Sequence, residues 1–159
     1  MALSESLVGM HYRYPDCYSV DREKIREHAT AVKNDDPAFF SEDAAAELGY
    51  DGVLAPLTFI SILGYAAQTA FFAHADIGIT DKQIVQIDQA LKFLKPIKAG
   101  DQLYCDVYVH SVRQAHGTDI IVTKNVVSNQ DDEVVQETYT TLAGRSEDDG
   151  ESGFNDGTA

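Results

Sequence analysis

Two adjacent carboxylates stand in the segment Asn34-Asp35-Asp36-Pro37, just after a predicted helix. An aspartate in a cleft that perturbs its pKa can act as a general acid or base, so Asp35 and Asp36 are the candidate catalytic residues of this chain. The same side chains also suit a turn, because an aspartate near a proline can hydrogen-bond its own backbone. We expect the turn, and keep Asp35 and Asp36 as the fallback acid and base.

The other residue types that commonly do chemistry form no second catalytic pattern. The five histidines are scattered along the chain, at His11, His28, His74, His110 and His116. Their spacing does not match a metal-ligand motif such as H-x-x-x-H, so we expect structural histidines, no metal site and no cofactor. Two cysteines, Cys17 and Cys105, cannot build a disulfide framework, and we expect both to be buried free thiols in strand-like segments.

The composition argues against several classes of function. The chain has 26 acidic and 12 basic side chains, and a formal net charge of −14. Nucleic acids and anionic membrane surfaces attract cationic faces, so neither is an expected partner. The first residues, MALSESLVGM, lack a basic leader followed by an apolar run, so we expect no signal peptide and a cytoplasmic protein.

Much of the acidic charge lies at the end of the chain. Residues 146–159 contain five carboxylates, three glycines and no Lys or Arg, and the rest of the chain carries 21 acids and 12 bases, or −9. Such a segment cannot bury enough apolar surface to offset the entropy lost on ordering. With 44% apolar residues overall, we expect one domain over residues 1–145 and an acidic disordered tail over 146–159.

Two helices are predicted before residue 50. Asp21 can cap a helix whose apolar stripe is Ile25, Ala29 and Val32. A second, short helix is expected to begin after Ser41 and to end before a glycine at position 49.

A third, longer helix is predicted from about Pro56 to His74, within a stretch from residue 52 to residue 75 that has no charged side chain. A helix that is apolar on every side either spans a membrane or is surrounded by protein. Polar residues such as Gln68 dilute the stretch and no Lys or Arg flanks it, so we expect a helix surrounded by protein.

The second half of the chain is predicted to form antiparallel strands. Apolar residues alternate with polar ones, which indicates strands with one buried face. The strands are expected within residues 84–94, 102–110, 119–127 and 133–143, with hairpin turns at Gly117 and at SNQDD. A simple packing solution is a sheet that curls around the long helix and buries it, which is an α+β fold.

Several motifs resemble those of one family. The turn KPIKAGD is similar to the Pro…Gly-Asp turn between two long strands of MaoC-like dehydratases and hydratases. Pro96 can end a strand, Gly100 supplies backbone freedom, and Asp101 can bond back to the turn. Together with MHYRYPDCYSV, NDDPAFF, GYDGVLAPLTF and QETYTTLAGR, the motifs cover about residues 8–145. They closely resemble the non-catalytic, substrate-binding (A-type) subunits of heterodimeric (3R)-hydroxyacyl-ACP dehydratases of mycolic-acid synthesis, in the MaoC-like hot-dog family.

The resemblance implies a hot-dog fold and a dehydratase, with one departure. Catalytic members carry an Asp and a His in a Gly-Asp-x-Asn-Pro-x-His loop. Aligned on Pro37, the chain has Asn34 at the Asp position and Phe39 at the His position, and counting from Asp35 instead reaches Phe40. A phenyl ring cannot transfer a proton, so we expect no catalytic residue in this chain and no activity when it is isolated. The resemblance implies a heterodimer whose partner hot-dog chain supplies the Asp and His.

The resemblance also implies that this chain lines a tunnel for the acyl chain. A fatty chain needs a dry, elongated, apolar channel, and the long helix offers large and small residues for its wall. Ser61 and Tyr65 lie four residues apart and therefore share a helical face. The candidate acyl-binding residues are Phe59, Ser61, Ile62, Gly64, Tyr65 and Phe72. The small residues can equally serve only to let the sheet approach the helix.

An acyl-ACP substrate needs a docking surface, and carrier proteins are acidic. Lys92, Lys95 and Lys98 form the one basic cluster we identify near the turn, and are the candidate docking residues. They equally suit solvated lysines that protect a strand end.

Two rival functions remain open. The first is a self-sufficient hot-dog hydratase or thioesterase that uses Asp35 or Asp36 as its base. The second is a non-enzymatic acyl-binding module without a catalytic partner.

Overall fold

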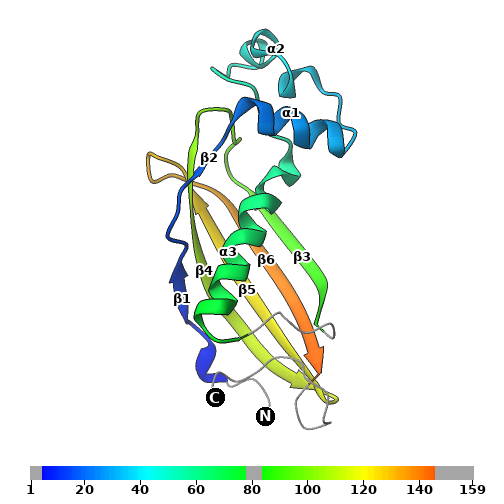
Figure 1. Cartoon of the computed structure of the whole chain (residues 1–159), viewed down its shortest axis with the longest axis vertical. Coiled ribbons are helices and arrows are strands. Elements are labelled where there is room, and N and C mark those ends of the chain that lie inside the picture. Colours follow the sequence, from blue (N-terminus) through cyan, green and yellow to red (C-terminus); the bar gives the residue numbers. More distant parts are fainter. Residues whose placement is uncertain (1–4, 78–83, 146–159) are drawn as a thin grey trace.

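The fold is an antiparallel sheet with one long helix on its inner face (Figure 1). The computed structural model describes residues 5–77 and 84–145. The main strands are β3 (Val85–Phe93), β4 (Gln102–Ala115), β5 (Thr118–Ser128) and β6 (Val134–Arg145). They pair in the order β4-β5-β6-β3, and two short strands, β1 (His11–Arg13) and β2 (Tyr18–Ser19), pair with the free side of β4.

The hairpins form where the sequence predicts them. His116 and Gly117 both have positive φ, 51° and 72°, which suits the tight turn between β4 and β5. Between β5 and β6, Asn129 accepts hydrogen bonds from the backbone N–H groups of Asp131 and Glu133 at 3.0 Å. These turns fix the register of the three long strands. Buried residues alternate with partly exposed ones along β4 to β6, so the predicted one-sided burial is confirmed for these strands.

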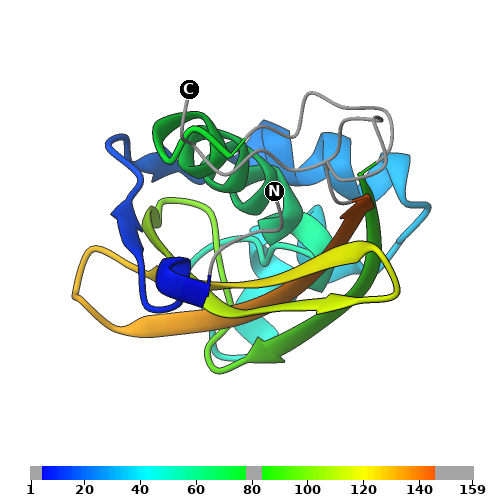
Figure 2. The same ribbon diagram turned by 90° about the horizontal axis from the view of Figure 1, so that it is seen from below.

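The central helix begins as a 3-10 turn, η3 (Leu57–Ile60), and continues as α3 (Ser61–His74). Figure 2 shows the sheet curved beneath it. Leu63, Ala67 and Phe71 are fully or almost fully buried, and α3 packs mainly over β4. The opposite face is open, with Leu57 62% and Tyr65 75% exposed. The prediction of a long apolar helix packed on a curled sheet is confirmed, but the sheet is open, so within the single chain it covers only one side of the helix.

The helix is also long and apolar enough to meet the length and hydropathy criteria for a membrane span over Leu57–His74. It lies on the sheet and contributes Phe59, Leu63, Phe71 and Phe72 to the core. One face of this helix is therefore packed in the core of the chain.

The edge strand β3 departs from its predicted pattern. It pairs only with β6 among the described strands, and its apolar side chains stay accessible, with Val85 54% and Ile87 53% exposed. A bulge between Gln86 and Asp88 interrupts the alternation. The expected buried face of this strand is wrong for the single chain, because α3 covers β4 rather than the β3 edge.

Two helices, α1 (Arg22–Ala31) and α2 (Glu42–Glu47), gather at one end of the sheet, with the 3-10 turn η2 (Pro37–Phe39) in the loop between them (Figure 1). A further 3-10 turn, η1 (Glu5–Leu7), lies at the opposite end and contacts β4. Asp21 caps α1 as predicted, but Val32 lies beyond the helix end and is exposed. Ser41 caps α2, and Gly49 follows with a φ of +91°.

Cys105 is buried as predicted, whereas Cys17 is exposed. The prediction for Cys17 is wrong because it lies in the exposed segment that connects β1 to β2, and not inside a strand. The proposed tail, residues 146–159, lies outside the described residues.

Candidate functional site: two cavities beside the central helix

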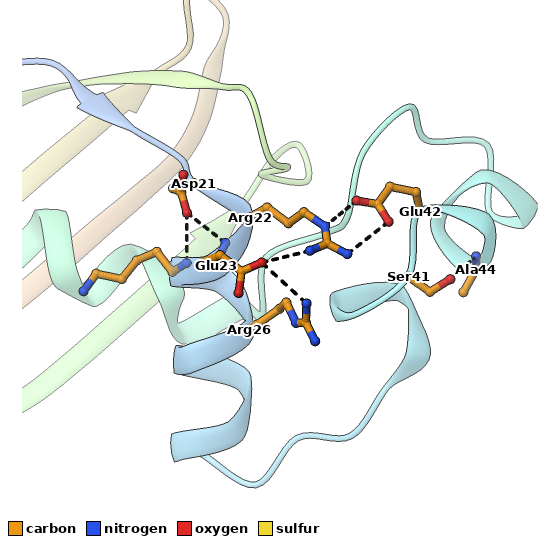
Figure 3. Close-up of polar contacts among 8 residues, drawn as sticks. Asp21, Arg22, Glu23, Arg26, Ser41, Glu42 and Ala44 are labelled. Carbon is orange, nitrogen blue, oxygen red and sulfur yellow. Dashed lines mark hydrogen bonds and ion pairs between the residues drawn. The ribbon is translucent and has the colours of Figure 1, made fainter.

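The loop that carries Asp35 and Asp36 lies between α1 and α2, which an ion pair ties together (Figure 3). Arg22 Nε donates to Glu42 Oε1 at 2.5 Å, and Glu23 accepts from both Arg22 and Arg26. The hydrogen bond with Arg22 lowers the pKa of Glu42, and the same bond raises the pKa of Arg22. The Arg22–Glu42 pair thus ties the first turn of α1 to the first turn of α2.

Asp36 is engaged in the loop itself. Its carboxylate accepts a hydrogen bond from the backbone N–H of Ala38 at 2.9 Å, and so caps η2. Asn34 Oδ1 accepts from the N–H of Asp36 at 3.3 Å. The predicted backbone-bonding role is thus confirmed for Asp36.

A first cavity, of about 380 Å³, opens beside this loop. Its lining is mostly apolar and comes from the loop, the segment before η3 and the segment after β3. The lining residues are Asp36, Phe39, Leu54, Ala55, Pro56, Leu57, Phe93, Leu94, Lys95, Pro96, Ile97 and Gln136. Phe39, at the position where the resemblance places a histidine, thus contributes a phenyl ring to this cavity.

All five histidines are among the described residues, and none of them lines this cavity or the second one. His28 is hydrogen-bonded to Thr58 at 3.0 Å. His11 contacts Asp106 at 2.7 Å where β1 pairs with β4. His74 and His110 pack against Tyr12 and Tyr139, and the fifth occupies the β4–β5 turn. Residues 5–77 and 84–145 contain no cluster of three or more His, Cys, Asp or Glu side chains that could hold a metal ion.

A second cavity, of about 260 Å³, lies further along α3, between the helix and strands β3, β5 and β6. Three of the six predicted acyl-binding residues line it: Ser61, Gly64 and Tyr65. Phe59 and Phe72 are instead fully buried in the core, and Ile62 packs against that core. The remaining lining residues are Ile60, Gln68, Gln86, Gln89, Leu91, Asn125, Thr138 and Thr140.

The wall of this second cavity is mixed, because polar side chains from the strands stand beside apolar ones, in contrast to the apolar channel expected from the sequence. We define the polar patch as the buried residues Thr123, Asn125, Gln136, Thr138 and Thr140 of β5 and β6. Thr123 and Thr140 are direct neighbours across the two strands, as are Asn125 and Thr138. The sequence does carry a signal for this patch, since the threonines and Asn125 occupy the same alternating positions as inward-facing Ile121 and Leu142.

Two side-chain amide atoms of the polar patch lack a hydrogen-bond partner. Asn125 Oδ1 and Gln136 Nε2 are buried and have no hydrogen-bond partner among the described residues. A buried polar atom without a partner costs about 1–3 kcal/mol. Gln136 lines the first cavity and Asn125 lines the second, so each cavity has an amide able to bond a ligand or water.

The three lysines proposed for docking have different surroundings. Lys95 pairs with Glu133, and Lys98 Nζ lies 2.9 Å from Asp51 and 3.7 Å from the buried Asp101. Asp101 also accepts a hydrogen bond from the N–H of Lys98 at 3.0 Å, which confirms the predicted closure of the turn. Gly100 has a φ of +96°, as the turn requires. Lys92 lies opposite Glu137 in the pairing of β3 with β6.

Comparison with known proteins agrees with this geometry. The family described as "FAS1-like, dehydratase domain region" matches residues 6–138. The chain belongs to this dehydratase family. A UPF0336 protein of Mycobacterium leprae is 69% identical over 159 residues, which is all of both chains. A UPF0336 protein of Mycobacterium tuberculosis is 53% identical over 148 residues, or 93% of this chain and 89% of that protein.

Solved structures place the dehydratase chain among hot-dog proteins, as the sequence predicts. A chain of the HadBC (3R-hydroxyacyl-ACP dehydratase) complex from Mycobacterium tuberculosis has 53% identity and a TM-score of 0.81, over 87% of this chain and 97% of that one. A MaoC-like dehydratase has 37% identity and a TM-score of 0.82, over 91% of this chain and 44% of that one. The fold class and the dehydratase family are therefore established.

Proposed function

We propose that this chain is the substrate-binding, non-catalytic subunit of a heterodimeric (3R)-hydroxyacyl-ACP dehydratase that acts in mycolic-acid elongation in the cytoplasm. The observation that carries the proposal is the first cavity, where Phe39 replaces the expected imidazole and Asp36 caps its own turn. The structural likeness to a chain of the HadBC complex supports a partnership between hot-dog chains.

Dehydration of a 3-hydroxyacyl thioester requires one group to remove the α proton and another to protonate the departing hydroxyl. The enolate oxygen that develops must also be stabilised by hydrogen-bond donors. In the proposed complex the partner's Asp and His transfer the protons. This chain binds the thioester beside α3, orients it and excludes water from it.

The exposed apolar surfaces of the chain support a partner subunit. Leu57 and Tyr65 on the open face of the central helix, and Val85 and Ile87 on the edge strand β3, are all more than half exposed. Among the strands of residues 5–77 and 84–145, β3 pairs only with β6, and a strand edge without a neighbour is a ready site for association with another chain. A second hot-dog chain that covers these surfaces would bury them and also close the two cavities.

Both cavities lie beside the central helix, the first against Leu57 and the second against Ile60, Ser61, Gly64 and Tyr65. The first is lined mainly by hydrocarbon side chains and suits the acyl chain, with about 0.8 kcal/mol gained for each buried CH₂. Ser61, Gly64 and Tyr65 contribute to binding through the second cavity. Lys92 is the docking candidate for ACP. Lys95 and Lys98 each pair with a carboxylate of this chain, and each would have to give up that ion pair before it could bind a carboxylate of ACP.

The proposal is tested by assaying hydration of a long-chain trans-2-enoyl thioester by the full chain, alone and co-expressed with a hot-dog chain that carries the Gly-Asp-x-Asn-Pro-x-His loop. We expect turnover only by the pair. Substitution of the partner's Asp and His should abolish it, whereas the Asp35→Asn, Asp36→Asn double variant of this chain should retain most of it. Turnover by the pure chain would contradict the proposal.

The rival function, a self-sufficient hydratase or thioesterase, has one observation in its favour, because Asp36 does line the first cavity. For that function, the same double variant should abolish the activity of the isolated chain. The assay therefore separates the two functions through opposite effects of the same substitutions.

A further inference from the structure

The second cavity contains a buried acceptor that the fold leaves unused. Asn125 is 3% exposed, and its Oδ1 has no partner among the described residues. Its neighbours do find partners: Thr123 Oγ1 donates to Gln68 Oε1 at 3.0 Å, and Gln89 Nε2 donates to Thr140 Oγ1 at 3.5 Å. The other buried amide atom without a partner, Gln136 Nε2, belongs to the lining of the first cavity, so Asn125 Oδ1 is the one in the lining of the second.

The chemistry of the lining defines what could supply that bond. Oδ1 of an amide is only an acceptor, so the ligand must bring an N–H or O–H donor. All the residues that line the cavity are uncharged, so nothing in the described lining would offset a carboxylate, phosphate or ammonium group. A plain hydrocarbon would leave Asn125 unsatisfied, and the apolar first cavity offers such a segment a better place. The fitting group is a neutral hydroxyl or amide.

The central helix leaves room for such a group directly over Asn125. Gly64 faces Asn125 across the cavity, and a Cβ atom added at Gly64 would lie 3.7 Å from Asn125 Nδ2. That distance is an ordinary van der Waals contact, so an added methyl group would reduce the space without a clash. The glycine therefore keeps open the part of the cavity next to the Asn125 amide.

We propose that the second cavity binds a neutral, hydrogen-bond-donating segment of the thioester substrate, and that Asn125 is the residue that selects for it. This inference rests on the proposed function and adds a specificity determinant to it. An acyl thioester has two sources of such a donor: the hydroxyl on the third carbon of the acyl group, and the amide N–H of the pantetheine-like arm.

The test measures dissociation constants of the full chain, in the assembly in which it purifies, for matched decanoyl thioesters. The four probes differ in two features. The acyl group either carries a 3-hydroxyl group or lacks it, and the thiol arm is either N-acetylcysteamine, which has an amide, or S-ethyl, which has none. The native protein should bind the probe with the recognised donor about tenfold more tightly than its matched analogue, as one added neutral hydrogen bond allows. The donor that produces the preference identifies the source.

Asn125→Leu, which keeps a similar side-chain size, should abolish this preference and leave binding of the donor-free probe unchanged. Gly64→Ala, which suits a helix and fills the space over the amide, should also weaken the preference and keeps the test valid if Asn125→Leu fails to fold. Thr141→Val, on the opposite face of β6, is the control and should bind as the native chain does.

The inference is overturned if the native protein shows no preference for either donor. It is also overturned if the preference survives Asn125→Leu. Where that variant does not fold, survival of the preference in Gly64→Ala overturns it. These results are distinguishable from failure of the proposed function. A preference that depends on Asn125, without turnover by any pair, would refute the dehydratase role alone. Turnover by the pair without the preference would refute only the role of Asn125.

Discussion

The inner face of the sheet has two regions of opposite character. On β4, the apolar strip of Leu103, Cys105, Val107 and Val109 is buried under α3. The polar patch on β5 and β6 is buried to the same extent, yet much of it faces the cavities rather than the helix. In both regions the buried residues alternate with outward-facing ones, so the strand geometry is the same in the two. The apolar region stabilises the fold by packing against α3, and the polar region is the one that we propose contacts a ligand.

The largest expected contrast concerns the two sides of α3. Phe71→Ala, on the side that faces β4, should lower the free energy of unfolding by about 3–5 kcal/mol because it leaves a cavity in the core. Tyr65→Ala, on the open side, should change it by less than about 0.5 kcal/mol in the isolated chain. Urea unfolding followed by circular dichroism measures both. Equal losses would mean that the open face is packed in the isolated protein.

A second contrast separates the two cavities within the complex. Ala55→Leu adds bulk to the apolar first cavity and should selectively reduce turnover of the longest acyl chains. Ser61→Phe fills the second cavity and should reduce turnover of all chain lengths by a similar factor. A series of enoyl thioesters of increasing length provides the measurement. A selective loss of long chains in Ser61→Phe would instead place the hydrocarbon tail in the second cavity.

Within the polar patch, two substitutions should have opposite signs. Asn125→Leu replaces an unsatisfied buried amide and should raise the free energy of unfolding of the unliganded chain by about 1 kcal/mol. Thr123→Val removes the hydrogen bond to Gln68 and should lower it by about 1 kcal/mol. Parallel denaturant titrations test the pair. Destabilisation by both would indicate that Asn125 supports the fold rather than a ligand.

The smallest effect concerns the thiols. Burial in the apolar strip raises the pKa of Cys105 to about 12, so this thiol stays protonated at pH 8 and unreactive. Cys17 is exposed, and its Sγ donates only to Gln102 at 3.3 Å. We expect a maleimide to modify one thiol per chain in the native protein and two in denaturant, as counted by mass spectrometry. Native modification of Cys105 would show that the apolar strip opens readily.

The sequence predicts local elements well where one residue type has one physical consequence. Asp21, Ser41 and Gly100 form the caps and the turn they were expected to form, and the long strands follow from alternation. The sequence does not predict burial where it depends on which other element covers a surface. Val85 and Tyr65 are apolar or aromatic, and only the three-dimensional arrangement shows that this chain leaves them open.

About half of the candidate site could be predicted from the sequence in the same way. Ser61, Gly64 and Tyr65 were identified because they share a segment of one helix, and the structure brings them to one cavity. The opposite wall comes from three strands, β3, β5 and β6, and no local pattern in the sequence encodes their meeting with the helix. The polar residues at inward positions of β5 and β6 were a usable signal, since alternation alone places Thr123 and Asn125 inside.

The central proposal is that this chain binds the substrate without converting it. The direct measurement incubates the isolated full chain with a 3-hydroxyacyl thioester, and determines both the bound fraction, by equilibrium dialysis, and the amount of enoyl product. We predict measurable binding and no enoyl product above the buffer control. Steady formation of enoyl thioester that disappears in the Asp35→Asn, Asp36→Asn double variant would contradict the claim.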